Sequence, residues 1–200
     1  MSRSPFRVLP ATCLLLVTAS GVVSEVDADS AGIAPCAISA WSTDRDPRGL
    51  DVRAGPGTGS PVIARLPPPL EVAGYTFAAE VSITGSKDGW FRIDSAILND
   101  YVDAREPEVV FKGEGWVSGR RLGLLLNHGD LHRGPTGSAP VVARLVKEDP
   151  DGKRHGPDSF IVDRLDACRG NWVEVEGTFL GARLRGWATG TCSNQVTTCP

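Results

Sequence analysis

Short stretches of alternating apolar and polar residues recur along most of the chain. They include Leu70–Ala73, Val81–Thr84, Trp90–Asp94 and Trp172–Glu176. Successive side chains of a β-strand point to opposite faces, so this period of two predicts short strands with one face toward a core. A helical pattern is a possible alternative to strands only in the insert Ser95–Glu106, which could hold one or two helical turns. We therefore predict an all-β protein.

The N-terminal segment has a different pattern. Arg3 and Arg7 precede an apolar run from Val8 to about Val23, which is the order of a secretory signal peptide. The run is broken by proline, glycine and hydroxyl residues and is short for a membrane span. Small residues favour cleavage after Ala19, with Ala28 as the alternative. The expected location is secreted or periplasmic, without a transmembrane anchor.

Export also bears on the cysteines. One of the five, Cys13, lies in the predicted signal peptide, and the even number that remains predicts two disulfides among Cys36, Cys168, Cys192 and Cys199.

Hairpin register suggests how these cysteines pair. Asn171–Gly177 and Ala182–Ala188 resemble two arms of a hairpin whose opposing residue numbers sum to about 359, which places Cys168 close to Cys192. We therefore favour a Cys168–Cys192 disulfide and a Cys36–Cys199 disulfide. Local pairing of Cys192 with Cys199 stays open.

The chain also repeats itself. Residues 51–66 and 130–145 align without gaps at an offset of 79, and eight of sixteen positions are identical. Each copy is followed by a tryptophan that opens an alternating strand, and then by Gly115-Trp116-Val117-Ser118-Gly119 or Gly186-Trp187-Ala188-Thr189-Gly190. A period near 80 residues suits a small domain rather than a solenoid unit. Composition agrees, because 23 glycines and 15 prolines supply many turns.

We therefore expect two tandem small barrels. The predicted boundaries are a signal peptide over residues 1–19, an N-terminal linker over 20–35, a first domain over 36–123 and a second over 124–200.

The segment Gly49–Leu66, with its Leu50-Asp51-Val52-Arg53 strand and Gly55-Pro56-Gly57 loop, resembles the opening of a bacterial SH3 (SH3b) domain. Lys87–Ile93 and Gly115–Leu122 resemble the later glycine-tryptophan strands of that family, in the right order. The second copy departs more, since His132 replaces the family arginine and Lys147–Ala167 is expanded. The resemblance implies SH3-like barrels that bind peptidoglycan or another cell-envelope peptide or protein.

Ligand-binding candidates come from the strand-to-loop corner and from the aromatic residues. Arg53 begins a glycine-rich corner of the kind that carries ligand contacts on a rigid barrel. Trp90 and Trp116, with Tyr75 or Phe91 nearby, are candidates for a shallow groove that binds peptide or glycan. Packing in the barrel core is the competing interpretation of the tryptophans.

The sequence supports a metal site or a catalytic site less strongly than it supports a binding surface. His128, Asp130 and His132 have strand spacing for a zinc site, but the first copy shares only the aspartate. Asp44, Asp46 and Asp51 fit Asx-turns better than a calcium loop, which needs a glutamate that is missing. We expect no metal and no cofactor.

The repeats absorb the chain from Cys36 onward, so no catalytic domain is left to use that cysteine as a nucleophile. The formal charge of −3, or −5 after removal of residues 1–19, disfavours nucleic acid as a partner. The sequence therefore predicts a binding protein that is not an enzyme. The alternatives are a small atypical envelope hydrolase and an interaction protein without a small ligand.

Overall fold

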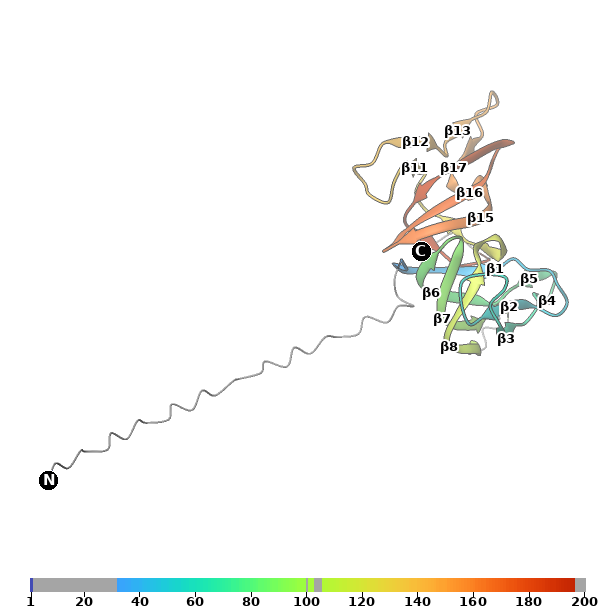
Figure 1. Ribbon diagram of the computed structural model, residues 1–200. Helices are drawn as coiled ribbons and strands as arrows, with labels where there is room; N and C mark the ends of the chain where they lie inside the picture. Colours follow the sequence, from blue (N-terminus) through green and yellow to red (C-terminus); the bar gives the residue numbers. More distant parts are fainter. Residues whose placement is uncertain (2–31, 100, 103–105, 197–200) are drawn as a thin grey trace. The chain divides into compact units, whose positions relative to one another are not determined.

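The computed structural model describes Met1 and residues 32–99, 101–102 and 106–196 (Figure 1). Contacts divide the chain into Met1–Ala31 and Gly32–Pro200, and the description that follows concerns the second unit. The predicted signal peptide lies outside the described residues except for Met1. Within the described ranges no helix has the length and apolar character that crossing a bilayer requires.

The described part of the chain is all-β, as predicted, with two short 3-10 helices and no α-helix. The larger sheet has the order β3-β2-β8-β7-β6-β1-β9. Its strands are β1 (Ala34–Ser42), β2 (Leu50–Arg53), β3 (Val62–Leu66), β6 (Glu80–Lys87), β7 (Trp90–Leu98), β8 (Glu108–Ser118) and β9 (Leu122–Gly123). The turn of helix allowed for Ser95–Glu106 is not found in the described part of that insert, where β7 continues to Leu98.

The second sheet has five strands in the order β12-β11-β17-β16-β15. They are β11 (Asp130–His132), β12 (Val141–Arg144), β15 (Phe160–Arg169), β16 (Trp172–Phe179) and β17 (Ala182–Ala188). Three two-stranded pairs and two 3-10 helices complete the unit: β4 (Leu70–Val72) with β5 (Tyr75–Phe77), β10 (Leu125–Leu126) with β18 (Thr191–Cys192), β13 (Lys147–Glu148) with β14 (Arg154–His155), η2 (Gly119–Arg121) and η3 (Pro157–Ser159).

Alternation places the apolar side of the strands inside. Phe91 and Ile93 of β7 and Val173 and Val175 of β16 are fully buried. Buried side chains from both sheets belong to one hydrophobic cluster. The two halves of the unit therefore share a core.

The internal repeat has the same strand register in both copies. On β2 and β3, Asp51 faces Arg65 and Arg53 faces Val62, with a bulge just before Arg53. On β11 and β12, Asp130 faces Arg144 and His132 faces Val141, with a bulge at the equivalent place. All four pairs keep the offset of 79 found in the sequence.

The glycine of each Gly-Trp segment has a packing role that the repeat also preserves. A Cβ on Gly115 would lie 2.3 Å from Val52 Cγ1, and one on Gly186 would lie 2.9 Å from Leu131 Cβ. Val52 and Leu131 are equivalent positions of the repeat, and both are fully buried. A side chain at either glycine would therefore push its neighbouring strand away.

The predicted hairpin near the C-terminus exists, but its register differs from the expected one. Val173 faces Ala188 and Phe179 faces Ala182, so opposing numbers sum to 361 rather than 359. The turn is two residues, Leu180 and Gly181, because both adopt positive φ angles of 48° and 86°.

The favoured disulfide pairing is wrong. Cys168 lies on β15, on the other side of β16 from β17, and it is bonded to Cys36 of β1. This bond excludes both Cys168–Cys192 and Cys36–Cys199. Cys192 is also disulfide-bonded, and Cys199 lies outside the described residues, so local pairing of these two stays a prediction.

Hydrogen bonds support the same junction. Ser86 Oγ donates to the carbonyl oxygen of Cys168 at 3.1 Å and accepts from its amide at 2.8 Å. The Gly170 amide donates to Pro35 O at 2.7 Å, and its carbonyl accepts from Ala37 at 2.8 Å. Strands β1 and β6 of the first repeat are thereby attached to β15 of the second.

The segment after β18 returns to the first sheet. The Gln195 amide side chain exchanges two hydrogen bonds of 2.9 Å with the backbone of Ala78. The buried carboxylate of Glu80 accepts hydrogen bonds from Ser193, at 2.8 Å, and from Tyr101. This carboxylate therefore holds both the C-terminal segment and the insert after β7.

The phenol of Tyr101 is expected to ionise late. Burial and the hydrogen bond to Glu80 raise its pKa from 10.0 to about 12. The unfolded chain loses this proton first, so the stabilising effect is complete below pH 10.0 and is lost as the pH rises through about 12. Ultraviolet titration of the Tyr75→Phe variant, which retains only this one of the two tyrosines, should show a midpoint near 12. A midpoint near 10.0 would contradict the contact with Glu80.

Candidate functional site

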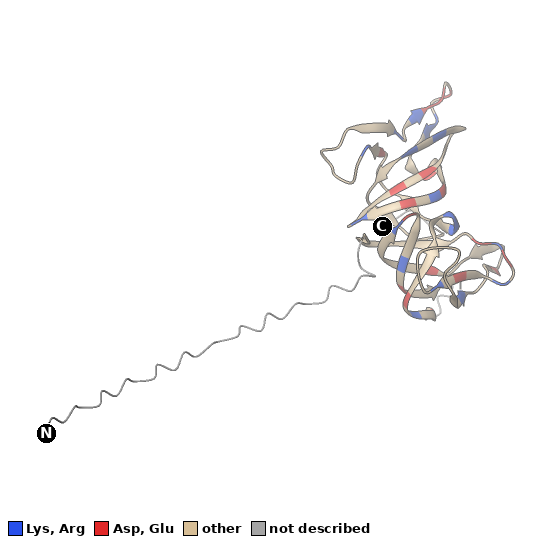
Figure 2. Cartoon of the chain, in the orientation of Figure 1, with Lys and Arg blue, Asp and Glu red and all other residues tan. Residues whose placement is uncertain are grey.

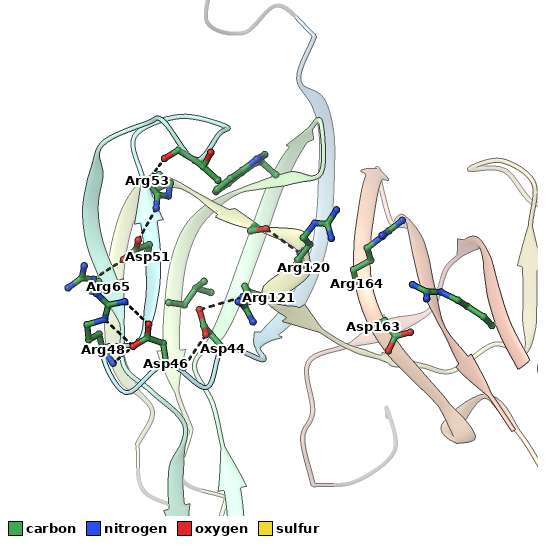
Figure 3. A pocket seen from close by; sticks show the side chains of 16 residues that line it. Asp44, Asp46, Arg48, Asp51, Arg53, Arg65, Arg120, Arg121, Asp163 and Arg164 are labelled. Atoms are coloured by element: carbon green, nitrogen blue, oxygen red, sulfur yellow. Dashed lines mark hydrogen bonds and ion pairs between the residues drawn. The ribbon is translucent and has the colours of Figure 1, made fainter. Parts of the chain in front are cut away.

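A pocket of about 600 Å³ is lined by side chains from both repeats (Figure 3). We call it the arginine pocket, because each basic residue that lines it is an arginine. Its charged residues are Arg48, Arg53, Arg65, Arg120, Arg121, Arg164 and Arg183, together with Asp44, Asp46, Asp51 and Asp163. Gly49, Leu50, Thr58, Trp90 and Ser118 complete the lining.

The loop between β1 and β2 forms one wall through the Asx-turns that the sequence predicts. Asp44 Oδ1 accepts from the Asp46 amide at 3.1 Å, and Asp46 Oδ1 accepts from the Arg48 amide at 2.9 Å. Arg48 also forms a two-point ion pair with the Asp46 carboxylate. These hydrogen bonds lower the pKa of Asp46 to about 2, so this carboxylate stays charged near neutral pH.

Asp51 and Arg53 form the next part of the wall. The Asp51 carboxylate accepts a hydrogen bond of 2.9 Å from Arg53 and one of 2.8 Å from Arg65. The second of these bonds joins β2 to β3 at the edge of the pocket. Arg53 Nη1 also donates to the carbonyl oxygens of Thr58 and Ser60. Arg53 therefore shapes the glycine-rich corner while it borders the pocket.

In the second copy a histidine takes over this structural contact. His132 Nδ1 lies 2.9 Å from Ala139 O, and Ala139 is the repeat equivalent of Ser60. The ring also contacts Trp172 edge-on, with centroids 5.2 Å apart. Asp130, another member of the zinc-like spacing, forms an ion pair with Arg144. The described residues contain no group of three metal-ligating side chains.

The opposite wall comes from the five-stranded sheet, whose strands carry charges of both signs (Figure 2). Arg164 of β15 forms ion pairs with Asp166 at 2.8 Å and with Glu176 at 2.6 Å. Burial acts to raise the pKa of Glu176, but the Arg183 hydrogen bond and the neighbouring arginine charges outweigh it, and the pKa is lowered. Arg164 and Arg183 are thus held in place by a carboxylate that stays ionised.

The structure brings together two of the five residues that the sequence singled out. Arg53 and Trp90 both line the arginine pocket. Phe91 and Trp116 are buried in the core. Tyr75 is exposed on the β4–β5 hairpin, where it stacks on Phe77, and it does not line this pocket.

Arg120 was not among the residues predicted to bind a ligand. It lies in η2, next to the second repeat, and lines the pocket together with Arg164 (Figure 3). The signal was present in the repeat itself. The first Gly-Trp segment is followed by Arg120-Arg121, whereas the second is followed by Thr191-Cys192. A pair of arginines without a counterpart in the other copy marks a difference that the shared fold does not require.

The lining of the pocket offers guanidinium groups and one aromatic side chain. Planar guanidinium groups bind carboxylate or phosphate oxygens through paired hydrogen bonds, and the half-buried Trp90 adds a flat apolar surface. Cys36 is bound in a disulfide and therefore offers no free thiolate as a nucleophile. Searches against protein families, curated proteins and solved structures found no match to the chain.

Proposed function

We propose that the protein is an exported, non-catalytic binding protein of the cell envelope, built from two tandem SH3-like barrels of the bacterial SH3 type. Its ligand is a peptide of the envelope, and peptidoglycan is the source that we favour. The observation that carries the proposal is the arginine pocket, to which both repeats contribute side chains.

Three features support this proposal. The all-β architecture and the shared register of β2–β3 and β11–β12 are those expected for two copies of one small β domain. The Cys36–Cys168 disulfide is compatible with an extracellular location, because such bonds persist in oxidising compartments. The pocket volume of about 600 Å³ lies in the usual range for ligand sites.

Cosedimentation with purified sacculi tests the proposal. The protein should sediment with sacculi, and Trp90→Ala should weaken binding by about tenfold, the loss typical of an aromatic anchor at an interface. The matched control is Tyr75→Ala, which removes an exposed aromatic side chain outside the pocket and should bind like the unmodified protein.

Thermal unfolding of both variants separates a loss of binding from a loss of fold. A protein that stays in the supernatant at every concentration would rule out the peptidoglycan ligand. Equal binding by Trp90→Ala and the unmodified protein would rule out the pocket as the site.

A further inference from the structure

The arginine pocket carries a charge opposite to that of the chain. Seven arginines and four aspartates line it, whereas the whole chain has a formal charge of −3. Charges collected in a concave site with protein walls act together on a ligand more strongly than the same charges spread over a surface. The positive balance of the lining therefore favours an anionic group over a cationic one.

Six of these seven arginines already have acidic partners. Arg48 pairs with Asp46, Arg53 and Arg65 pair with Asp51, Arg121 pairs with Asp44, and Arg164 and Arg183 pair with Glu176. Among the described residues Arg120 has no such partner, and its side chain is exposed at the pocket. The paired arginines fix the shape of the walls, while Arg120 can receive a ligand oxygen without breaking an existing ion pair.

Arg120 also stands where the pocket continues into a second hollow of about 410 Å³. Both hollows share Thr58, Trp90, Ser118, Arg120 and Arg164. The charged side chains of the second hollow are balanced, with Asp88, Asp166 and Glu174 beside Arg120, Arg164 and Arg185. An anionic group at Arg120 can thus be followed by a less charged part of the same ligand along Trp90.

We infer that the pocket recognises a carboxylate of its peptide ligand and that Arg120 is the guanidinium that binds it. That the carboxylate belongs to a peptidoglycan peptide rests on the proposed function. That the pocket binds a carboxylate does not rest on the proposed function. The planar fork of arginine makes two parallel hydrogen bonds to a carboxylate, which an ammonium group cannot reproduce.

Isothermal titration with a synthetic peptidoglycan stem peptide tests the inference. The peptide with free carboxylates should bind the unmodified protein, and Arg120→Ala should weaken it by about tenfold to a hundredfold, as expected for a lost hydrogen bond to a charged group. Arg120→Lys should restore only part of the affinity. Arg133→Ala is the matched control, since Arg133 is an exposed arginine on the β11–β12 loop outside the pocket.

A second titration uses the same peptide with its carboxylates amidated. This peptide should bind weakly, and Arg120→Ala should not weaken it further, because the two changes remove one interaction. Equal affinity for both peptides, or full affinity of Arg120→Ala for the free peptide, would overturn the inference while leaving the proposed function in place.

Citrate separates failure of the inference from failure of the proposed function. If neither sacculi nor the stem peptide binds, the arginine Nε–H signals are followed by NMR during a citrate titration. A shift that is lost in Arg120→Ala and kept in Arg133→Ala would retain the carboxylate site and reject peptidoglycan as its source. No shift would overturn the site as well.

Discussion

Replacement of Cys36 and Cys168 together by alanine is expected to lower the free energy of unfolding by about 4 kcal/mol. The disulfide closes a loop with a sequence separation of 132, and long loops gain most from a cross-link in the unfolded state. Cys168 is also fully buried in the shared core. Urea unfolding followed by tryptophan fluorescence measures the change.

The matched control is replacement of Cys192 and Cys199 by alanine. If these two pair locally, their loop is short and the loss is expected to be only about 2 kcal/mol. Peptide mapping without reductant should recover Cys36 linked to Cys168. A fragment that links Cys168 to Cys192 would contradict the structure, and equal stability of the two double variants would contradict the loop-length argument.

The disulfide also restrains the arginine pocket. It attaches β1 of the first repeat to β15 of the second, and β15 carries Asp163 and Arg164 of the arginine pocket. Reduction removes a covalent restraint on the relative position of these walls. A ligand that needs both walls would then pay an additional ordering cost on binding.

Local sequence patterns predicted the positions of several β-strands well, because the alternation of a strand depends on neighbouring residues. Alternation in Trp90–Asp94 and Trp172–Glu176 located β7 and β16. The offset of 79 identified residues 51–66 and 130–145 as equivalent segments, and the structure gives both the same register. The all-β class followed from these segments because each exposes and buries alternate side chains. Several strands are longer than the short strands predicted, since β7 has 9 residues, β8 has 11 and β15 has 10.

The disulfide was missed because its position depends on strand order, which alternation does not encode. The hairpin of β16 and β17 was expected to place Cys168 beside the strand that returns after it. In the structure Cys168 precedes β16 and lies on β15, so the intervening strand separates it from β17. The partner on β1 is 132 residues away, where local register offers no information.

Only part of the candidate site could be predicted from the sequence, for a similar reason. Arg53 and Trp90 follow from motif positions within one copy. The contributions of Arg164 and Arg183 depend on how the second sheet packs against η2, and they were not predicted. Phe91 and Trp116 were candidates because aromatic residues serve both cores and binding surfaces, and burial assigned them to the core.

Substitution Gly119→Ala is expected to destabilise the fold by about 3 kcal/mol and to displace Arg120. A Cβ at Gly119 would lie 2.1 Å from Leu165 O and 2.6 Å from Phe91 Cε2. The first of these atoms belongs to the backbone of β15 and cannot rotate away, so η2 must move off the second sheet. Thermal and urea unfolding measure the loss of stability, and binding of the stem peptide reports the displacement of Arg120.

Gly137→Ala is the matched control for this prediction. A Cβ at Gly137 meets no atom within 4 Å, and its φ lies outside the left-handed region. The same chemical change should therefore leave stability unchanged or raise it slightly, because alanine restricts the unfolded chain. If Gly119→Ala unfolds like Gly137→Ala, the close packing of η2 on β15 is wrong. The position of Arg120 beside Arg164 would then lose its structural basis, since η2 is the element that places it there.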